Sequence, residues 1–119
     1  SSDLPQVYYV GLLAGENDMA LLNKTKVGRD INRHYYSREE VLSDLQKPVV
    51  KRLLDLMRLR NTHPAFGGAF SSAAPAAHLL TLTWQDGAAY ARLEVDLLAK
   101  SGRICHGHSA EDEVVFELR

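Results

Sequence analysis

Residues 80–95 read LTLTWQDGAAYARLEV and carry the clearest structural signal of the chain. Apolar residues alternate with threonine before the pair Asp86-Gly87, and small or aliphatic residues alternate with tyrosine, arginine and glutamate after it. A period of two is typical of a strand with one buried face, and Asp-Gly is typical of a tight turn. The stretch therefore predicts a β-hairpin, with Trp84 as the anchor of its core.

Further strands are expected on the C-terminal side of the hairpin, at residues 103–105 and 113–118. Together with the hairpin they predict a small antiparallel sheet whose polar face meets water. On the N-terminal side, residues 65–77 are rich in glycine, alanine and serine and include Pro75. This composition favours a connector between two kinds of structure.

Histidines near these strands raise the question of a metal site. Residues 105–108 read CHGH, and thiolate and imidazole groups are zinc ligands. Because no second ligand cluster accompanies them, the sequence favours a turn between strands, and we expect no metal and no cofactor. His63, which precedes Pro64, is expected at a helix end, where the helix dipole favours its protonated form.

The N-terminal half of the chain predicts another kind of structure. Residues 7–13 read VYYVGLL and are apolar at both alternating sets of positions. This pattern favours a strand buried on both faces, as in a parallel sheet covered by helices. One or two helical turns are expected at residues 18–22, and residues 24–33 are polar and irregular.

Two helices are expected before the connector. Ser37, with Glu40 three residues later, forms the reciprocal capping pattern that begins a helix, here over about residues 38–46. Pro48 suits the first turn of a second helix, and apolar residues recur at helical spacing from there to about residue 61. The chain therefore predicts an α+β fold.

Composition limits the classes of function. The 119 residues suffice for one small domain, and 45% hydrophobic with 24% charged residues is typical of a globular chain. With 14 Lys and Arg against 15 Asp and Glu, no dense positive field is expected, which argues against nucleic acid as a partner. The longest apolar run is far shorter than the roughly 20 residues that span a bilayer, so we expect no membrane partner. The one cysteine allows no internal disulfide and favours a cytoplasmic location.

Four segments carry a family resemblance: PQVYYVGLLAG at residues 5–15, NDM at 17–19, GRDINRHYYS at 28–37 and PVVK at 48–51. In this order they resemble the C-terminal portion of sucrose phosphorylase. That enzyme belongs to the α-amylase clan of glycoside hydrolases, with relatives that act on sucrose 6'-phosphate or glucosylglycerate. The resemblance is dense up to about residue 70 and thins afterwards.

The resemblance implies a place for each part of the chain. Residues 7–10 would form the last strand of a (β/α)8 barrel, and the segment up to Ser37 the loop that follows it. Such loops line the face on which these barrels carry their active sites. Residues 1–64 would then be the C-terminal end of a catalytic barrel, and residues 65–119 a small antiparallel C-terminal β-domain.

The resemblance also implies an activity for the full-length protein. Sucrose or a related α-glucoside would react with phosphate to give glucose 1-phosphate with retention, through one attacking carboxylate and one carboxylic acid that protonates the departing fructose. In the family both groups lie on earlier barrel strands, so no catalytic residue is assigned to this chain. Its acidic residues match non-catalytic positions, among them Asp18, Asp30, Glu39 and Glu40.

One residue of the chain matches a substrate contact of the family. Arg29 corresponds to the arginine that contacts the glucosyl unit where the glycosidic bond breaks, a role that suits the planar fork of a guanidinium. The alternative is a structural ion pair with Asp30 or a neighbour. Four further residues could edge the sugar site: Arg33, His34, Tyr35 and Tyr36. For the tyrosines, packing of the loop against barrel helices is the favoured interpretation.

A rival hypothesis is a stand-alone module derived from this family, which has lost catalysis and self-associates or binds sugar. Without strand partners, residues 7–10 would leave unpaired edges and apolar faces in water. We therefore expect a homo-oligomer formed through exposed strand edges. An upstream reading frame with the other barrel strands and the catalytic acids would favour the enzyme.

Overall fold

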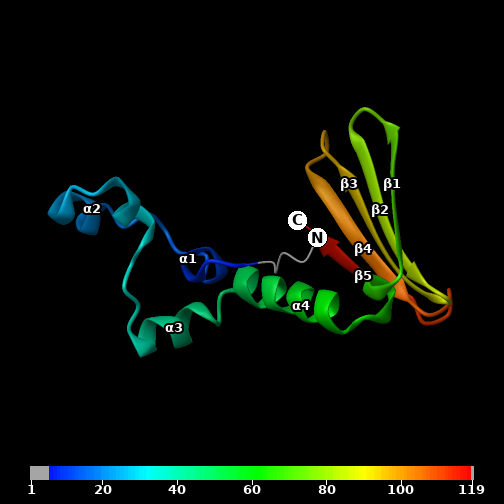
Figure 1. Cartoon of the computed structure of the whole chain (residues 1–119), viewed down its shortest axis with the longest axis horizontal. Helices are drawn as coiled ribbons and strands as arrows, with labels where there is room; N and C mark the ends of the chain where they lie inside the picture. Colours follow the sequence, from blue (N-terminus) through cyan, green and yellow to red (C-terminus); the bar gives the residue numbers. More distant parts are fainter. Residues whose placement is uncertain (1–5, 119) are drawn as a thin grey trace. The chain divides into compact units, whose positions relative to one another are not determined.

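The structure is a computed structural model and describes residues 6–118. Pro5, the first residue of the family motifs, lies outside the described residues. The chain forms two compact units that divide between Arg58 and Leu59. Figure 1 shows helices in the first unit and the five-stranded sheet of the second.

The first unit consists of short helices joined by irregular segments. Its elements are α1 (Tyr9–Leu12), α2 (Met19–Thr25), the 3-10 helix η1 (Gly28–Asn32), α3 (Arg38–Asp44) and α4 (Pro48–Thr62), which continues past the division. Among the described residues of this unit, the buried hydrophobic side chains are Val10, Leu13 and Val50. Because so few apolar side chains are buried, hydrogen bonds and ion pairs contribute much of the stability of this unit. Across residues 6–118, no helix combines the length and the hydropathy that a membrane span requires.

The strand predicted at residues 7–13 is absent. Tyr8 is extended, but the helix α1 follows at once, and its first hydrogen bond runs from the amide of Leu12 to the carbonyl of Tyr8 (2.9 Å). A strand needs neighbours for its backbone groups, and no strand in the described part of this unit supplies them, whereas a helical turn satisfies them locally. Val7 is 51% exposed rather than buried on both faces. The prediction of a barrel strand at residues 7–10 is therefore wrong in this structure.

The two predicted helices are confirmed. The hydroxyl of Ser37 accepts the amide hydrogen of Glu40 (3.2 Å), and the Glu40 carboxylate accepts that of Ser37 (2.6 Å). This reciprocal pair satisfies amide donors that the first turn of α3 cannot pair by itself. Pro48 begins α4 as expected. The helical turns predicted near Asp18 are α2, and Asp18 is its N-cap.

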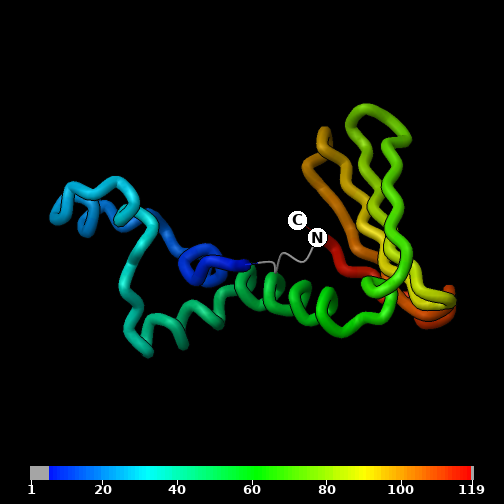
Figure 2. Tube along the Cα trace, viewed as in Figure 1, coloured from blue at the N-terminus to red at the C-terminus, as the bar shows by residue number. Residues whose placement is uncertain are grey.

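The second unit is an open antiparallel sheet preceded by a 3-10 turn. Its elements are η2 (Pro64–Gly67), β1 (Ala69–Ala76), β2 (Leu79–Asp86), β3 (Ala89–Asp96), β4 (Ser101–Gly107) and β5 (Val114–Leu118). The strands lie side by side in sequence order, each antiparallel to the next. The trace in Figure 2 follows this meander from green to red. The predicted antiparallel sheet is confirmed.

The predicted hairpin consists of β2 and β3. Asp86 pairs with Ala89, so the turn falls directly after Asp86, as the Asp-Gly pair indicates. Trp84 lies opposite Ala91, and its ring packs against Phe66 of η2 with 5.1 Å between ring centroids. Beneath these rings Ala65 is completely buried. Alanine side chains therefore let η2 approach the sheet closely, and Trp84 anchors this core as predicted.

Two segments of the second unit differ from the sequence prediction. Residues 69–76 form β1 where the sequence predicts a connector, and residues 106–107 continue β4 past the strand predicted at 103–105, where the sequence favours a turn. β1 reads AFSSAAPA and is mostly exposed, so it has little strand propensity and no buried face of its own. Pairing with β2 orders it, and that long-range contact leaves no local signal in the sequence.

Candidate functional site

Arg29, the predicted substrate contact, lies on η1 and is exposed. Within the described part of the chain, no ion pair or hydrogen bond joins its guanidinium to Asp30 or to another residue. The backbone that carries it is held, because the amide of Asp18 donates to the carbonyl of Ile31 on η1 (2.6 Å). The structure thus holds the backbone beside Arg29 in place and leaves the side chain of Arg29 exposed.

His34 connects the elements around this segment. Its Nδ1 lies 2.8 Å from a carboxylate oxygen of Asp18, and its Nε2 lies 3.1 Å from a carboxylate oxygen of Glu40. Asp18 caps α2 by accepting the amide hydrogen of Leu21 (2.8 Å) through its other oxygen. Glu40 belongs to the capping box of α3. The imidazole therefore links the first turns of two helices.

Charge and hydrogen bonding reinforce each other in this group. The hydrogen bond to Asp18, and then the one to Glu40, raises the pKa of His34. The same bond from His34 lowers the pKa of Asp18, and the amide of Ser37, followed by His34, lowers the pKa of Glu40. The three shifts favour an imidazolium between two carboxylates.

The predicted rim residues are not brought together as one surface. Tyr36 packs edge-on against the His34 ring, with 4.7 Å between ring centroids, and burial raises its pKa. The hydroxyl of Tyr9 donates to the carbonyl of His34 (3.0 Å). By contrast, Arg33 is exposed and Tyr35 is 79% exposed. The structure thus places His34 and Tyr36 in the loop's packing and leaves the other two in solvent.

An open groove of about 490 Å³ lies beside this group. The charged and aromatic residues that line it are Glu16, Asp18, His34, Tyr36, Glu40, Asp44 and Lys47. The Lys47 ammonium pairs with Asp44 (2.9 Å) and also donates to the carbonyls of Leu13 (3.3 Å) and Ala14 (3.4 Å), at the end of α1. Most of the charged side chains that line the groove therefore already have partners.

Sequence reasoning identifies His34 and Tyr36 but misses the residues that hold them. It assigns Glu40 only a capping role, treats Asp18 only as non-catalytic and does not single out Lys47. The capping pattern was a usable signal for Glu40, six residues from its histidine partner. Asp18 lies 16 residues from His34, and no local pattern indicates that pairing.

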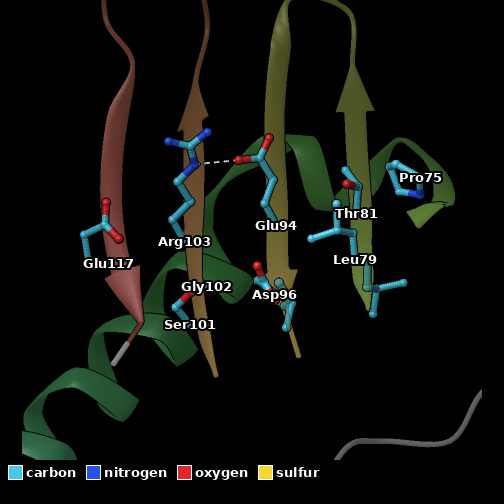
Figure 3. Close-up of a pocket in the computed structure, with 11 residues that line it drawn as sticks. Pro75, Leu79, Thr81, Glu94, Asp96, Ser101, Gly102, Arg103 and Glu117 are labelled. Carbon is cyan, nitrogen blue, oxygen red and sulfur yellow. Dashed lines mark hydrogen bonds and ion pairs between the residues drawn. The ribbon is translucent and has the colours of Figure 1, made fainter. Parts of the chain in front are cut away.

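A second concavity, of about 360 Å³, lies on the polar face of the sheet (Figure 3). There the guanidinium of Arg103 pairs with Glu94 across neighbouring strands (2.5 Å), and Arg92 pairs with the other oxygen of Glu94 (2.9 Å). Arg103, first among these contacts, lowers the pKa of Glu94. The charges are compensated within the sheet, which makes this a stabilised polar face rather than a reactive site.

His63, the N-cap of η2, meets two other histidines, one on β4 and one directly after it. The His63 ring centroid lies 5.1 Å from that of His106 and 5.4 Å from that of His108. Burial, and then the charges of these two neighbours, lowers the pKa of His63, and its Nδ1 accepts the amide hydrogen of Ala65 (3.3 Å). His63 lies directly after α4, at a helix end as expected, but the expected dipole-favoured protonation is wrong, because burial lowers the pKa of the ring. Over residues 6–118, no group of three or more His, Cys, Asp or Glu is arranged to hold a metal ion.

Relatives of known activity share much of this sequence. No family model matches the chain. Sucrose phosphorylase of Agrobacterium vitis is 56% identical over 92 residues, which cover 77% of this chain and 19% of that protein. Glucosylglycerol phosphorylase of Marinobacter adhaerens is 48% identical over 103 residues, which cover 87% of this chain and 22% of that protein. The chain thus spans about a fifth of the length of the curated relatives that it matches.

A solved structure agrees with these sequences. The crystal structure of sucrose 6F-phosphate phosphorylase from Thermoanaerobacter thermosaccharolyticum matches with a TM-score of 0.89 and 42% identity. The match covers 96% of this chain and 23% of that one. Identity at this level over almost every residue indicates common descent as well as a common fold. The chain therefore belongs to the sucrose phosphorylase family and corresponds to the C-terminal portion of its members.

Proposed function

We propose that this chain is the C-terminal part of a cytoplasmic glucoside phosphorylase. The whole enzyme would transfer the glucosyl unit of sucrose or a related α-glucoside to phosphate, and the product would be glucose 1-phosphate with retained configuration. The observation that carries this proposal is the 56% identity to a sucrose phosphorylase over 77% of the chain. In this proposal residues 1–64 are the C-terminal end of the catalytic barrel and residues 65–119 are a small antiparallel C-terminal β-domain.

Within that enzyme, Arg29 would contact the glucosyl unit at the bond that breaks. Its exposure and the tether between η1 and α2 support this role. A guanidinium whose backbone is fixed can present two parallel N–H donors to sugar oxygens or to a carboxylate beside them. Arg33 and Tyr35, both exposed, would extend the rim, whereas His34 and Tyr36 would support it from within.

The pKa values and hydrogen bonds of Asp18 and Glu40 argue against a catalytic role for these two acids. A general acid needs a raised pKa, and a nucleophile needs an unencumbered carboxylate oxygen. Asp18 and Glu40 instead accept hydrogen bonds and have lowered pKa values. The two catalytic carboxylates are therefore proposed to lie in the rest of the enzyme.

A donor assay tests the proposed activity. The full-length enzyme that contains these residues is incubated with phosphate and either sucrose, sucrose 6F-phosphate or glucosylglycerol, and glucose 1-phosphate is measured. We expect release from at least one donor, and the highest kcat/KM identifies the preferred glucoside. No product from any donor would contradict the proposal and favour the non-catalytic module.

Replacing Arg29 tests the proposed contact. A hydrogen bond to a charged group contributes roughly 1.5–3 kcal/mol, so Arg29→Ala is expected to lower kcat/KM by about tenfold to a hundredfold. The matched control is Arg38→Ala, which removes an exposed guanidinium from the first turn of α3. Equal losses in the two variants would contradict a specific role for Arg29.

We also propose that the chain self-associates through the edge of β5. The sequence predicts self-association through unpaired edges of a strand at residues 7–10, and that reason no longer holds. The sheet of the second unit, however, has two edges, formed by β1 and β5. β1 contains Pro75, which cannot donate to a further strand, whereas β5 exposes Val114 and Val115 and has no proline. Sedimentation should show a dimer that Val115→Lys weakens, and a monomer at every concentration would contradict this.

A further inference from the structure

The side chain of His34 makes a contact that only one of its charge states can complete. Both ring nitrogens face carboxylate oxygens, at 2.8 Å from Asp18 and 3.1 Å from Glu40. A neutral imidazole carries one N–H and donates one of these bonds, whereas an imidazolium carries two and donates both. Ionised carboxylates only accept hydrogen bonds, so the neutral ring would leave one nitrogen lone pair facing a negative oxygen. The geometry is therefore that of an imidazolium clamp.

The clamp holds both ends of the segment that carries Arg29. The Asp18 carboxylate pairs with the His34 ring, and the Asp18 amide donates to the carbonyl of Ile31 (2.6 Å). Glu40 in turn fixes His34 to the first turn of α3. Loss of the His34 bonds would release the segment between η1 and α3, and the bond between the Asp18 amide and the Ile31 carbonyl would then be left to hold Arg29 beside α2.

The surroundings of the ring offer no rival explanation of its charge. From α1, the Tyr9 hydroxyl donates to the carbonyl of His34 rather than to its ring (3.0 Å). From the loop, Tyr36 presents its ring edge-on. Asp44 and Lys47, which line the same groove, pair with each other (2.9 Å), and Glu16, a further carboxylate of that groove, is not among the groups that raise the pKa of His34. The two carboxylates are therefore the groups that set the protonation of His34.

We propose that His34 is a positioning residue of the phosphorolysis reaction: clamped between Asp18 and Glu40, it fixes η1 so that Arg29 meets the glucosyl unit. This inference rests on the proposed function. It assigns His34 no contact with substrate and makes the reaction dependent on the charge of a residue that does no proton transfer. Raising the pH would remove the proton, break one of the two bonds and loosen Arg29.

The charge of His34 can be measured without any assay of activity. Nitrogen-proton NMR correlations of the imidazole rings in this chain distinguish imidazolium from each neutral tautomer. We expect His34 to stay doubly protonated above its ordinary value of 6.5, and Glu40→Gln to shift its titration to lower pH. The control is His78→Gln, which alters a ring in the turn between β1 and β2 and should leave the His34 signals unchanged. A His34 ring that is neutral at pH 6.5 would overturn the clamp.

A double-mutant cycle in the full-length enzyme tests positioning. A misplacement of about 1 Å can cost about a hundredfold in rate, so His34→Gln is expected to lower kcat/KM by about tenfold to a hundredfold. If His34 acts through Arg29, the same change in an Arg29→Ala background should cost less than about twofold, because coupled residues are not additive. The alkaline fall of kcat/KM should also disappear in His34→Gln. His78→Gln is the control that should leave activity unchanged.

The outcomes separate the two proposals. Fully additive losses, or an alkaline fall that survives in His34→Gln, would overturn the positioning role while the enzyme remained a phosphorylase. An unsubstituted enzyme that releases no glucose 1-phosphate would overturn the proposed function and this inference with it. If His34→Gln does not fold, Glu40→Gln replaces it in the cycle, since that variant keeps an oxygen for the Ser37 amide. Glu40→Gln alone is then expected to lower kcat/KM by less than His34→Gln would, and to cause no such loss in the Arg29→Ala background. An additive loss would overturn the positioning role of His34.

Discussion

The two units of this chain are ordered by opposite kinds of contact, and one histidine in each shows the difference. His34 lies between two carboxylates that raise its pKa, whereas His63 lies beside two other histidines, accepts a backbone hydrogen, and has its pKa lowered by burial. The first unit buries few apolar side chains and depends on charged hydrogen bonds. The second depends on a backbone ladder and on alanines that permit close approach. The first should therefore be sensitive to charge and the second to volume.

The largest expected effect comes from one methyl group in the second unit. A Cβ at Gly68 would lie 2.0 Å from the carbonyl oxygen of Gln85. The backbone of β2 is held by strands on both sides and cannot yield, so Gly68→Ala is expected to lower the free energy of unfolding by about 3 kcal/mol. Urea unfolding followed by the fluorescence of Trp84 measures this loss. Gly67→Ala meets nothing within 4 Å and is the matched control, and a similar loss there would contradict the steric reason.

The same methyl group should matter less in the first unit. A Cβ at Gly15 would lie 2.2 Å from the hydroxyl oxygen of Tyr36, the far end of a side chain that can move, and 2.9 Å from Cγ1 of Val10. Gly15→Ala is therefore expected to cost about 1 kcal/mol, measured by thermal unfolding of the helical circular dichroism signal. Tyr36→Phe removes that oxygen, and in this background the cost should fall. An unchanged cost beside Tyr36→Phe would show that another contact is responsible. Gly11→Ala, which meets nothing within 4 Å, is the control.

The same contrast explains what the sequence could reveal. The hairpin around Asp86 and the helix after Ser37 are specified by residues close together in the chain, and both predictions are confirmed. Strand β1 forms because it pairs with β2, and its own alanines and serines give no local signal of a strand. The strand predicted at residues 7–13 failed for the converse reason, because an apolar run favours burial but does not supply the neighbours that a strand requires.

The candidate site shows the same limit. The family motif at residues 28–37 identifies Arg29 and its neighbours, and their assignment to substrate stays a prediction. The pairing of His34 with Asp18 could not be predicted, because it depends on how α2, η1 and α3 are placed in space. Local chemistry thus predicts caps and turns, whereas the contacts that tie the loop together arise only from its tertiary arrangement.

The smallest expected effect is a pair of opposite pH dependences. The folded state raises the pKa of His34, so its contribution is complete below the ordinary value of 6.5 and is lost as the pH rises through the folded value. The folded state lowers the pKa of His63, so its contribution is complete above 6.5 and is lost as the pH falls toward the folded value. The first unit should therefore weaken on the alkaline side of 6.5, and the second on the acid side.

Two probes separate these dependences. The helical circular dichroism signal follows the first unit, and the fluorescence of Trp84, the one tryptophan, follows the second. His34→Gln should flatten only the alkaline fall of the first unfolding midpoint, and His63→Gln only the acid fall of the second. Because Asp18 and Glu40 have lowered pKa values, their contribution is lost as the pH falls below the ordinary carboxyl range, so the first unit should weaken again there. If the two midpoints shift together with pH in every variant, the two units unfold as one. The opposite pH dependences would then describe the two histidines and not two units that unfold separately.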